Sequence, residues 1–220
     1  MFPENFAVLV VGNPNAGMFE FCSFIAATHI NADERLVFVE TNMSSDNVRQ
    51  QMQVFGAEAI EAENRDRLAL IDCRASRRTP EMDEKSIKVG DTGNLEEIIE
   101  RVEEGIVRVG GAPVNVMFDS VTPLYMHHDS NDVGKFFSAI SSLVKVSGRM
   151  TSTVHSAIVP DEQIALLSTI ADGVLELRMD EDFHRFVRIK HFRGLRVTPE
   201  WVPFDFDRDE ESSGALLSWR

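Results

Sequence analysis

The sequence has few cysteines and no long apolar run, and each shortage excludes a class of protein. Two cysteines, Cys22 and Cys73, cannot build a disulfide framework. We therefore expect buried, reduced thiols and a cytoplasmic location. No apolar run approaches the ~20 residues that span a bilayer, and the N-terminus lacks a basic region followed by an apolar core. We expect no membrane-spanning segment and no membrane partner.

Lysine is also scarce: it supplies 5 of the 22 basic residues, against 36 acidic ones, and the net charge is −14. A surface of this charge repels a phosphate backbone, so nucleic acid is not an expected partner. Excess acid with little lysine is typical of proteins from halophilic organisms, where salt screens the repulsion between like charges. This indicates a haloarchaeal source, and an acidic mesophilic protein is the alternative.

Short apolar runs alternate with helical patterns along most of the 220 residues. Strands are expected at 6–11, 35–40, 68–71, 113–119 and 151–159, with helices between them and a long polar loop over 74–93. Three further strands, at 174–179, 183–192 and 195–203, follow one another directly and should be antiparallel. The pattern predicts an α/β fold with a mainly parallel sheet flanked by helices and antiparallel strands at its C-terminal edge. We expect one domain over 1–204 and an acidic tail over 205–220.

The loop after the first strand has the glycine spacing of a phosphate-binding P-loop, G-x-x-x-x-G-K-[ST]. It consists of Gly12, Asn13, Pro14, Asn15, Ala16 and Gly17. Met18 and Phe19 stand where the lysine and the hydroxyl residue belong. The lysine meets the β- and γ-phosphates and the hydroxyl holds Mg²⁺, which a thioether and a phenyl ring cannot do. We expect the loop to keep its path, with both glycines permitting the tight turn and Phe19 filling the space of a phosphate.

A second nucleotide signature is the apolar strand at 114–118 that ends in Asp119. A carboxylate at that end of a parallel strand lies near a phosphate loop and can hold Mg²⁺ through water. Any α/β strand can end in aspartate, so the feature is weak alone. Its place after the loop in the same chain makes it stronger.

Together these stretches resemble the KaiC-like branch of the RecA superfamily of ATPases, over about residues 6–204. The stretches that carry the resemblance are 10–17, 50–56, 116–124 and 187–194. It implies a RecA-like fold, whose active members bind ATP between the subunits of a ring. A homo-oligomer is therefore one expectation for this chain.

The resemblance also identifies positions where this chain departs from active relatives. One or two glutamates that activate water follow the second strand in those relatives, and Asn42 and Met43 occupy the matching positions here. A lysine and an arginine reach the neighbouring subunit's γ-phosphate, and here they are His191 and Arg193. We expect no catalytic residue, no metal and no cofactor, although the helix N-terminus leaves weak ATP binding open.

The first functional hypothesis is a catalytically degenerate KaiC-like protein that acts through protein partners in regulation or signal transduction. One alternative is a nucleotide-binding protein or slow ATPase with a non-standard site around Asp119 and Arg193. Another is an accessory paralogue in DNA recombination, which would need Arg74, Arg77 and Arg78 to form a basic patch on the long loop.

Overall fold

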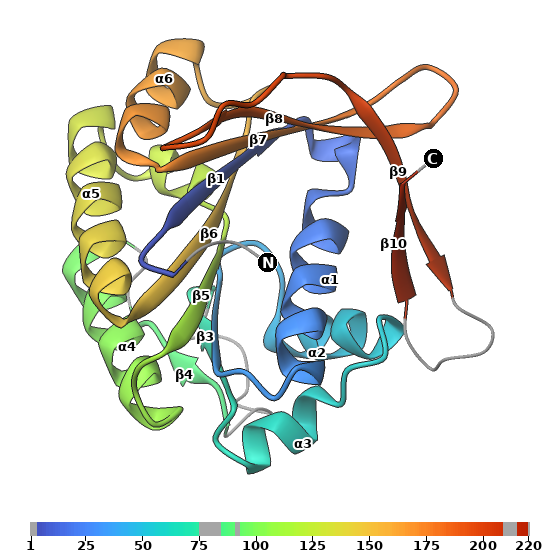
Figure 1. Cartoon of the computed structure of the whole chain (residues 1–220). Helices are drawn as coiled ribbons and strands as arrows, with labels where there is room; N and C mark the ends of the chain where they lie inside the picture. The colour runs from blue at the N-terminus through green and yellow to red at the C-terminus, as the bar shows by residue number, and fades with distance from the viewer. Residues whose placement is uncertain (1–3, 75–84, 91–92, 209–214, 220) are drawn as a thin grey trace.

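The computed structural model describes residues 4–74, 85–90, 93–208 and 215–219 (Figure 1). Within these residues one sheet has the strand order β10-β9-β8-β7-β1-β6-β5-β2-β3-β4. The strands are β1 (Ala7–Gly12), β2 (Leu36–Glu40), β3 (Leu68–Asp72), β4 (Ile87–Lys88), β5 (Val114–Asp119), β6 (Gly148–His155), β7 (Gly173–Met179), β8 (Arg185–Phe192), β9 (Val202–Arg208) and β10 (Ala215–Trp219). Strands β1 to β7 pair in parallel, and β8 to β10 extend the sheet antiparallel from β7. The predicted α/β fold class is confirmed.

Helices cover both faces of the parallel part of the sheet. They are α1 (Met18–Asn31), α2 (Ser45–Val54), α3 (Ala59–Asn64), α4 (Leu95–Arg108), α5 (Ser130–Ser147) and α6 (Asp161–Ile170), with the 3₁₀ helices η1 (Pro14–Ala16) and η2 (Thr122–Met126). Figure 1 shows α4, α5 and α6 on one side of the sheet and α1, α2 and α3 on the other. No helix in the described part of the chain is long and apolar enough to span a membrane.

Strand β2 shows why the central strands are apolar throughout. Val37 and Val39 belong to the hydrophobic cluster beneath α4 and α5, whereas Leu36 and Phe38 belong to the cluster beneath α1, α2 and α3. All four side chains are fully buried. A strand covered on both faces reads as a continuous apolar run instead of an alternating one. The two cysteines are also buried and unpaired, as predicted.

The C-terminal strands differ from the prediction. The strand expected over 195–203 is wrong, because β9 begins at Val202 and continues to Arg208. Phe204 and Phe206 on this strand pack on aromatic rings of α1: the centroids of Phe204 and Phe21 are 5.9 Å apart, and those of Phe206 and Phe24 are 6.0 Å apart. Strands β9 and β10 therefore lie beside α1 (Figure 1), and the residue at which we expected a tail to begin lies inside β9.

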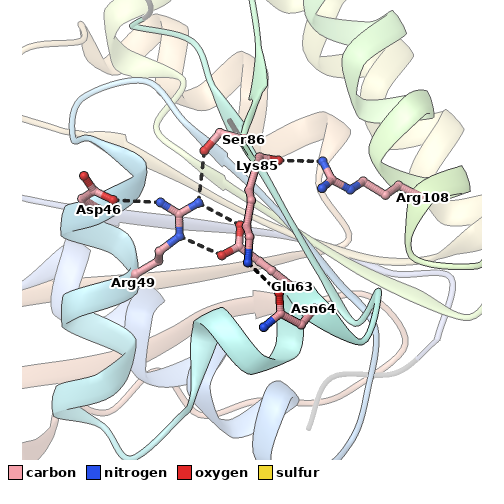
Figure 2. Close-up of polar contacts among 7 residues, drawn as sticks. All are labelled: Asp46, Arg49, Glu63, Asn64, Lys85, Ser86 and Arg108. Carbon is pink, nitrogen blue, oxygen red and sulfur yellow. Dashed lines mark hydrogen bonds and ion pairs between the residues drawn. The ribbon is translucent and has the colours of Figure 1, made fainter. Parts of the chain in front are cut away.

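The expected long loop over 74–93 contains the short edge strand β4, and residues 75–84 and 91–92 lie outside the described part. Figure 2 shows the polar network that fixes the chain just before β4. Arg49 of α2 donates from Nε and Nη2 to the two carboxylate oxygens of Glu63 at 2.7 and 2.8 Å. The Nη2 atom also donates to Ser86 Oγ at 3.3 Å, and Arg108 of α4 donates to the carbonyl oxygen of Lys85 at 2.7 Å. Helices α2, α3 and α4 are thus joined to this edge of the sheet.

Candidate functional site

The loop between β1 and α1 follows the strand–turn–helix path of a phosphate loop. The amide of Ala16 donates to the carbonyl oxygen of Asn13 at 2.9 Å, which closes the η1 turn. Gly17 has φ +78° and ψ 36°, a left-handed conformation that glycine adopts without strain, and α1 begins at the next residue. On the far side of the loop, Ser156 Oγ donates to Asn13 Oδ1 at 3.0 Å. Asn15 is an exposed residue of the same turn.

Met18 turns into the core. It is 1% exposed and belongs to an apolar cluster that includes Val10, Leu177 and Phe192. A Cβ on Gly12 would lie 2.8 Å from the Met18 sulfur and 3.1 Å from the Leu177 carbonyl oxygen. Gly12 does not have a left-handed backbone, so glycine is needed here for the close approach of Met18 and not for a special φ. Where a P-loop has a charged amine, this chain has a buried thioether.

A cation from β8, not the ring of Phe19, lies closest to the turn. Phe19 packs against the cluster between α1, β2 and α2. The Nε atom of Arg185 lies 2.9 Å from the position of a Cβ on Gly17. The same guanidinium approaches Asp205 at 3.4 Å and lies 5.6 Å from the ring centroid of Phe206. No local pattern marks Arg185, because the antiparallel strands bring it to the loop from the far end of the sequence.

Two carboxyl groups end neighbouring strands beside this loop. Asp119 ends β5 and Glu40 ends β2, and the two residues are register partners. Both are buried, and Thr153 Oγ1 donates to Asp119 Oδ1. Glu40 Oε1 accepts from the amides of Asn42 and Met43, the latter at 2.6 Å. Sequence reasoning singled out Asp119 and missed Glu40, although the strand before Glu40 carries the same signal, an apolar run that ends in an acid.

The carboxyl pair has shifted acidity. Burial raises the pKa of Asp119 to about 6; the hydrogen bond from Thr153 lowers it and the charge of Glu20 raises it further. Burial, followed by the charge of Asp119, raises the pKa of Glu40 to about 9. Both shifts favour the neutral, protonated form of these carboxyl groups. Glu20 Oε2 is itself 3.6 Å from the position of a Cβ on Gly17, so acids crowd the space beside the loop.

The residues at the expected base positions lie at the same edge of the sheet. The side chain of Asn42 donates from Nδ2 to Ser120 Oγ at 3.3 Å, directly after Asp119. Met43 is the next residue and is partly buried. The structure thus brings the loop, Asn42, Met43 and Asp119 together. An amide and a thioether stand where the resemblance predicts a water-activating carboxylate.

His191 and Arg193 lie at the opposite, amino-terminal edge of the parallel strands. His191 pairs in register with Val174 near the start of β7 and is exposed. Arg193 forms an ion pair with Asp172, which also accepts from the amide of Ala7 at 2.9 Å and pairs with Lys145 at 2.9 Å. Within one subunit the structure therefore separates these two residues from the loop, and Arg193 is held by its own chain.

The groups that the resemblance implies, ATP and Mg²⁺, can be tested against this site. The buried sulfur of Met18 supplies neither charge nor a metal ligand, and the ring of Phe19 has no hydroxyl. The described residues contain no group of three or more His, Cys, Asp or Glu side chains arranged to hold a metal ion. The residues present do not fit a Mg²⁺–triphosphate. Of the arginines considered for a DNA-binding patch, Arg74 donates to the Asn42 carbonyl oxygen at 3.4 Å, and Arg77 and Arg78 lie outside the described residues.

Comparison with known proteins agrees with this architecture. A solved KaiC-like protein from the hyperthermophilic archaeon Pyrococcus horikoshii OT3 has a similar fold, with a TM-score of 0.72 and 18% sequence identity over 99% of this chain and 91% of the other. The comparison with curated proteins gave no match. The family model described as "ATPase: KaiC" matches residues 1–210, and so nearly the whole chain. The chain belongs to the KaiC family of ATPases.

Proposed function

We propose that this chain is a KaiC-family protein that no longer turns over ATP and acts by binding other proteins, in regulation or signal transduction. The observation that carries the proposal is the position of Met18, packed on Gly12 inside an apolar cluster. The lysine that this residue replaces provides charge to the transferred phosphoryl group.

The other residues missing from the nucleotide site also argue against ATP turnover. One arginine supplied to a phosphoryl-transfer site can be worth about 10³–10⁵ in rate, which shows how much a single charged group can contribute. This chain has lost the lysine, the Mg²⁺ hydroxyl and the water-activating carboxylate, at positions 18, 19 and 42–43. Their combined loss leaves no useful turnover, whereas the intact fold still offers a large surface to partners.

The test is phosphate release from ATP and Mg²⁺ by the purified protein, beside an Asp119→Ala variant. We expect both proteins to equal the buffer blank. Turnover by the wild-type protein that disappears in Asp119→Ala would contradict the proposal.

Affinity purification from the native host, with and without ATP depletion, tests the proposed binding of other proteins. Complexes that survive depletion support nucleotide-independent binding, and complexes that need ATP contradict it.

A second candidate is a protein that binds nucleotide without turnover. It is favoured by Arg185, whose guanidinium lies against Gly17 and could meet an anion at the N-terminus of α1. Isothermal titration with ATP, compared between the wild type and Arg185→Gln, separates the two candidates. Binding that depends on Arg185 would promote the second one.

A further inference from the structure

A cavity of about 260 Å³ opens at the amino-terminal ends of the parallel strands, the edge opposite to the phosphate loop. Its lining comes from the residues that lead into β1, β2, β3, β5 and β6. The residues that matter for binding are Glu34, Arg35, Arg67, Asn115 and Arg149. Drug-sized ligands occupy pockets of about 300–1,000 Å³, so this cavity suits a smaller molecule.

Asn115, which lines this cavity, leaves a buried hydrogen-bond acceptor unused. The residue is buried, with an exposed fraction of 6%. The Nδ2 atom donates to Glu34 Oε2 at 2.9 Å and to the Arg35 carbonyl oxygen at 3.1 Å, which fixes the orientation of the amide. The buried Oδ1 atom has no hydrogen-bond partner among the described residues. Leaving a buried acceptor without a partner costs free energy, so a ligand donor at this point would be favoured.

Arg149 leaves a donor unused beside it. It is the register partner of Asn115 on the neighbouring strand, and neighbouring strands lie about 4.8 Å apart. Its Nη1 atom is buried and lacks a partner within the described part of the chain. A guanidinium prefers a carboxylate or phosphate, to which it can donate two parallel hydrogen bonds.

Glu34 provides negative charge on the same side of the cavity. Burial raises the pKa of this carboxyl, but hydrogen bonds from Asn115 and His29 and the charge of Arg149 outweigh that effect, so the pKa lies below its usual value. The hydrogen bond between His29 Nδ1 and Glu34 Oε2 is 2.7 Å long. The lining thus presents both an anionic group and an unpartnered cationic group.

We propose that this cavity binds a free α-amino acid. Arg149 would hold the carboxylate, and the ammonium group would donate to Asn115 Oδ1 and Glu34. A simple anion would leave Asn115 Oδ1 unpaired and would face the charge of Glu34. A simple cation would leave the Arg149 guanidinium unpaired. A molecule with both charges on adjacent carbons satisfies both orphaned groups in a cavity of this size. The site is separate from the phosphate loop, so the proposal does not depend on the proposed function.

The first experiment measures binding to the full chain with each standard L-amino acid in turn. The readouts are the thermal unfolding midpoint and the NMR signals of the His29 ring, which lies behind Glu34. We expect at least one amino acid to raise the midpoint and to shift the His29 signals. The strongest ligand is then compared with the matching carboxylate that lacks the amine and the matching amine that lacks the carboxylate. Neither fragment should bind as well as the amino acid.

Variants then assign the binding to this cavity. Arg149→Gln removes one charge-assisted contact and should weaken binding about tenfold or more. Arg149→Lys, which keeps the charge but loses the forked geometry, should also bind more weakly, and it replaces the glutamine variant if that protein does not fold. Arg65→Gln is the control, because Arg65 is an exposed residue that pairs with Glu61 and does not line the cavity. It should bind like the wild type.

Three results would overturn the proposal: no amino acid changes either readout, the isolated carboxylate binds as tightly as the amino acid, or both Arg149 variants bind like the wild type. The second result would mean that the cavity is an anion site only. None of these binding measurements uses ATP. A failure of this proposal is therefore distinguishable from a failure of the proposed function.

Discussion

The Met18 sulfur lies 2.8 Å from the position that a Cβ on Gly12 would occupy, so the side chain of one loop residue packs onto the bare backbone of another. This contact joins the start of α1 to the end of β1. It occupies the part of the loop where the P-loop pattern has its lysine.

Gly12→Ala should therefore destabilise the fold by overpacking, by about 1–3 kcal/mol. Met18→Ala alone should cost about 2–5 kcal/mol through the cavity that it leaves. The double variant should cost less than the sum, because the added methyl group enters the space that the thioether vacates. Urea unfolding of the four proteins checks this, and strict additivity would mean that the two residues do not interact.

Met18→Lys combined with Phe19→Thr should not restore ATP turnover. The two changes return phosphate charge and a Mg²⁺ ligand, so weak nucleotide binding is the expected gain. Hydrolysis also needs a base where Asn42 and Met43 stand, and groups that act together in a transition state do not add back one at a time. Isothermal titration and phosphate release measure the two effects separately. A fully active enzyme after these changes would identify a recently silenced ATPase.

Glu40→Gln should make the fold less sensitive to alkaline pH. The pKa of Glu40 is raised in the folded state, from 4.5 to about 9, so the folded protein binds its proton more tightly than the unfolded chain does. The stability from this group is complete below pH 4.5 and is lost as the pH rises through about 9. Glutamine keeps the acceptor for the amides of Asn42 and Met43 without the ionisation. The unfolding midpoint of the variant, followed from pH 5 to about 9, should fall less than that of the wild type, and parallel curves would contradict the buried acid.

Glu63→Ala should be destabilising, by about 1.5–3 kcal/mol, because it removes the two-bond partner of the Arg49 guanidinium in the network of Figure 2, while the pair with Asp46 remains. The Glu63 side chain is only 2% exposed and that of Arg49 only 11%. The matched control is Glu61→Ala two residues away, which breaks the exposed pair with Arg65 and should cost less than about 1 kcal/mol. Urea unfolding of both variants gives the comparison. Equal losses would show that burial does not set the strength of the Arg49–Glu63 pair.

Most of the architecture could be predicted from local pattern. The run from Leu36 to Val39 predicts a strand covered on both faces, and Gly17 marks the left-handed turn before α1. The prediction went wrong at β9, where the stabilising contacts are rings of α1 far away in the sequence. Phe204 and Phe206 draw the strand onto Phe21 and Phe24, and the apolar residues Leu195 and Val197 lie outside any strand.

The sequence by itself determined the chemical inventory of the loop: a glycine-bounded turn with Met18 and Phe19 where charge and a hydroxyl belong. Only the tertiary structure decided what lies beside that loop. Glu40 meets Asp119 because two strands more than 70 residues apart are register partners, and Arg185 reaches Gly17 across the antiparallel strands. Asn115 and Arg149 meet in the same way at the other edge. Local propensity acts over a few residues, whereas strand order is decided by packing of the whole chain, so these pairs could not be derived from spacing.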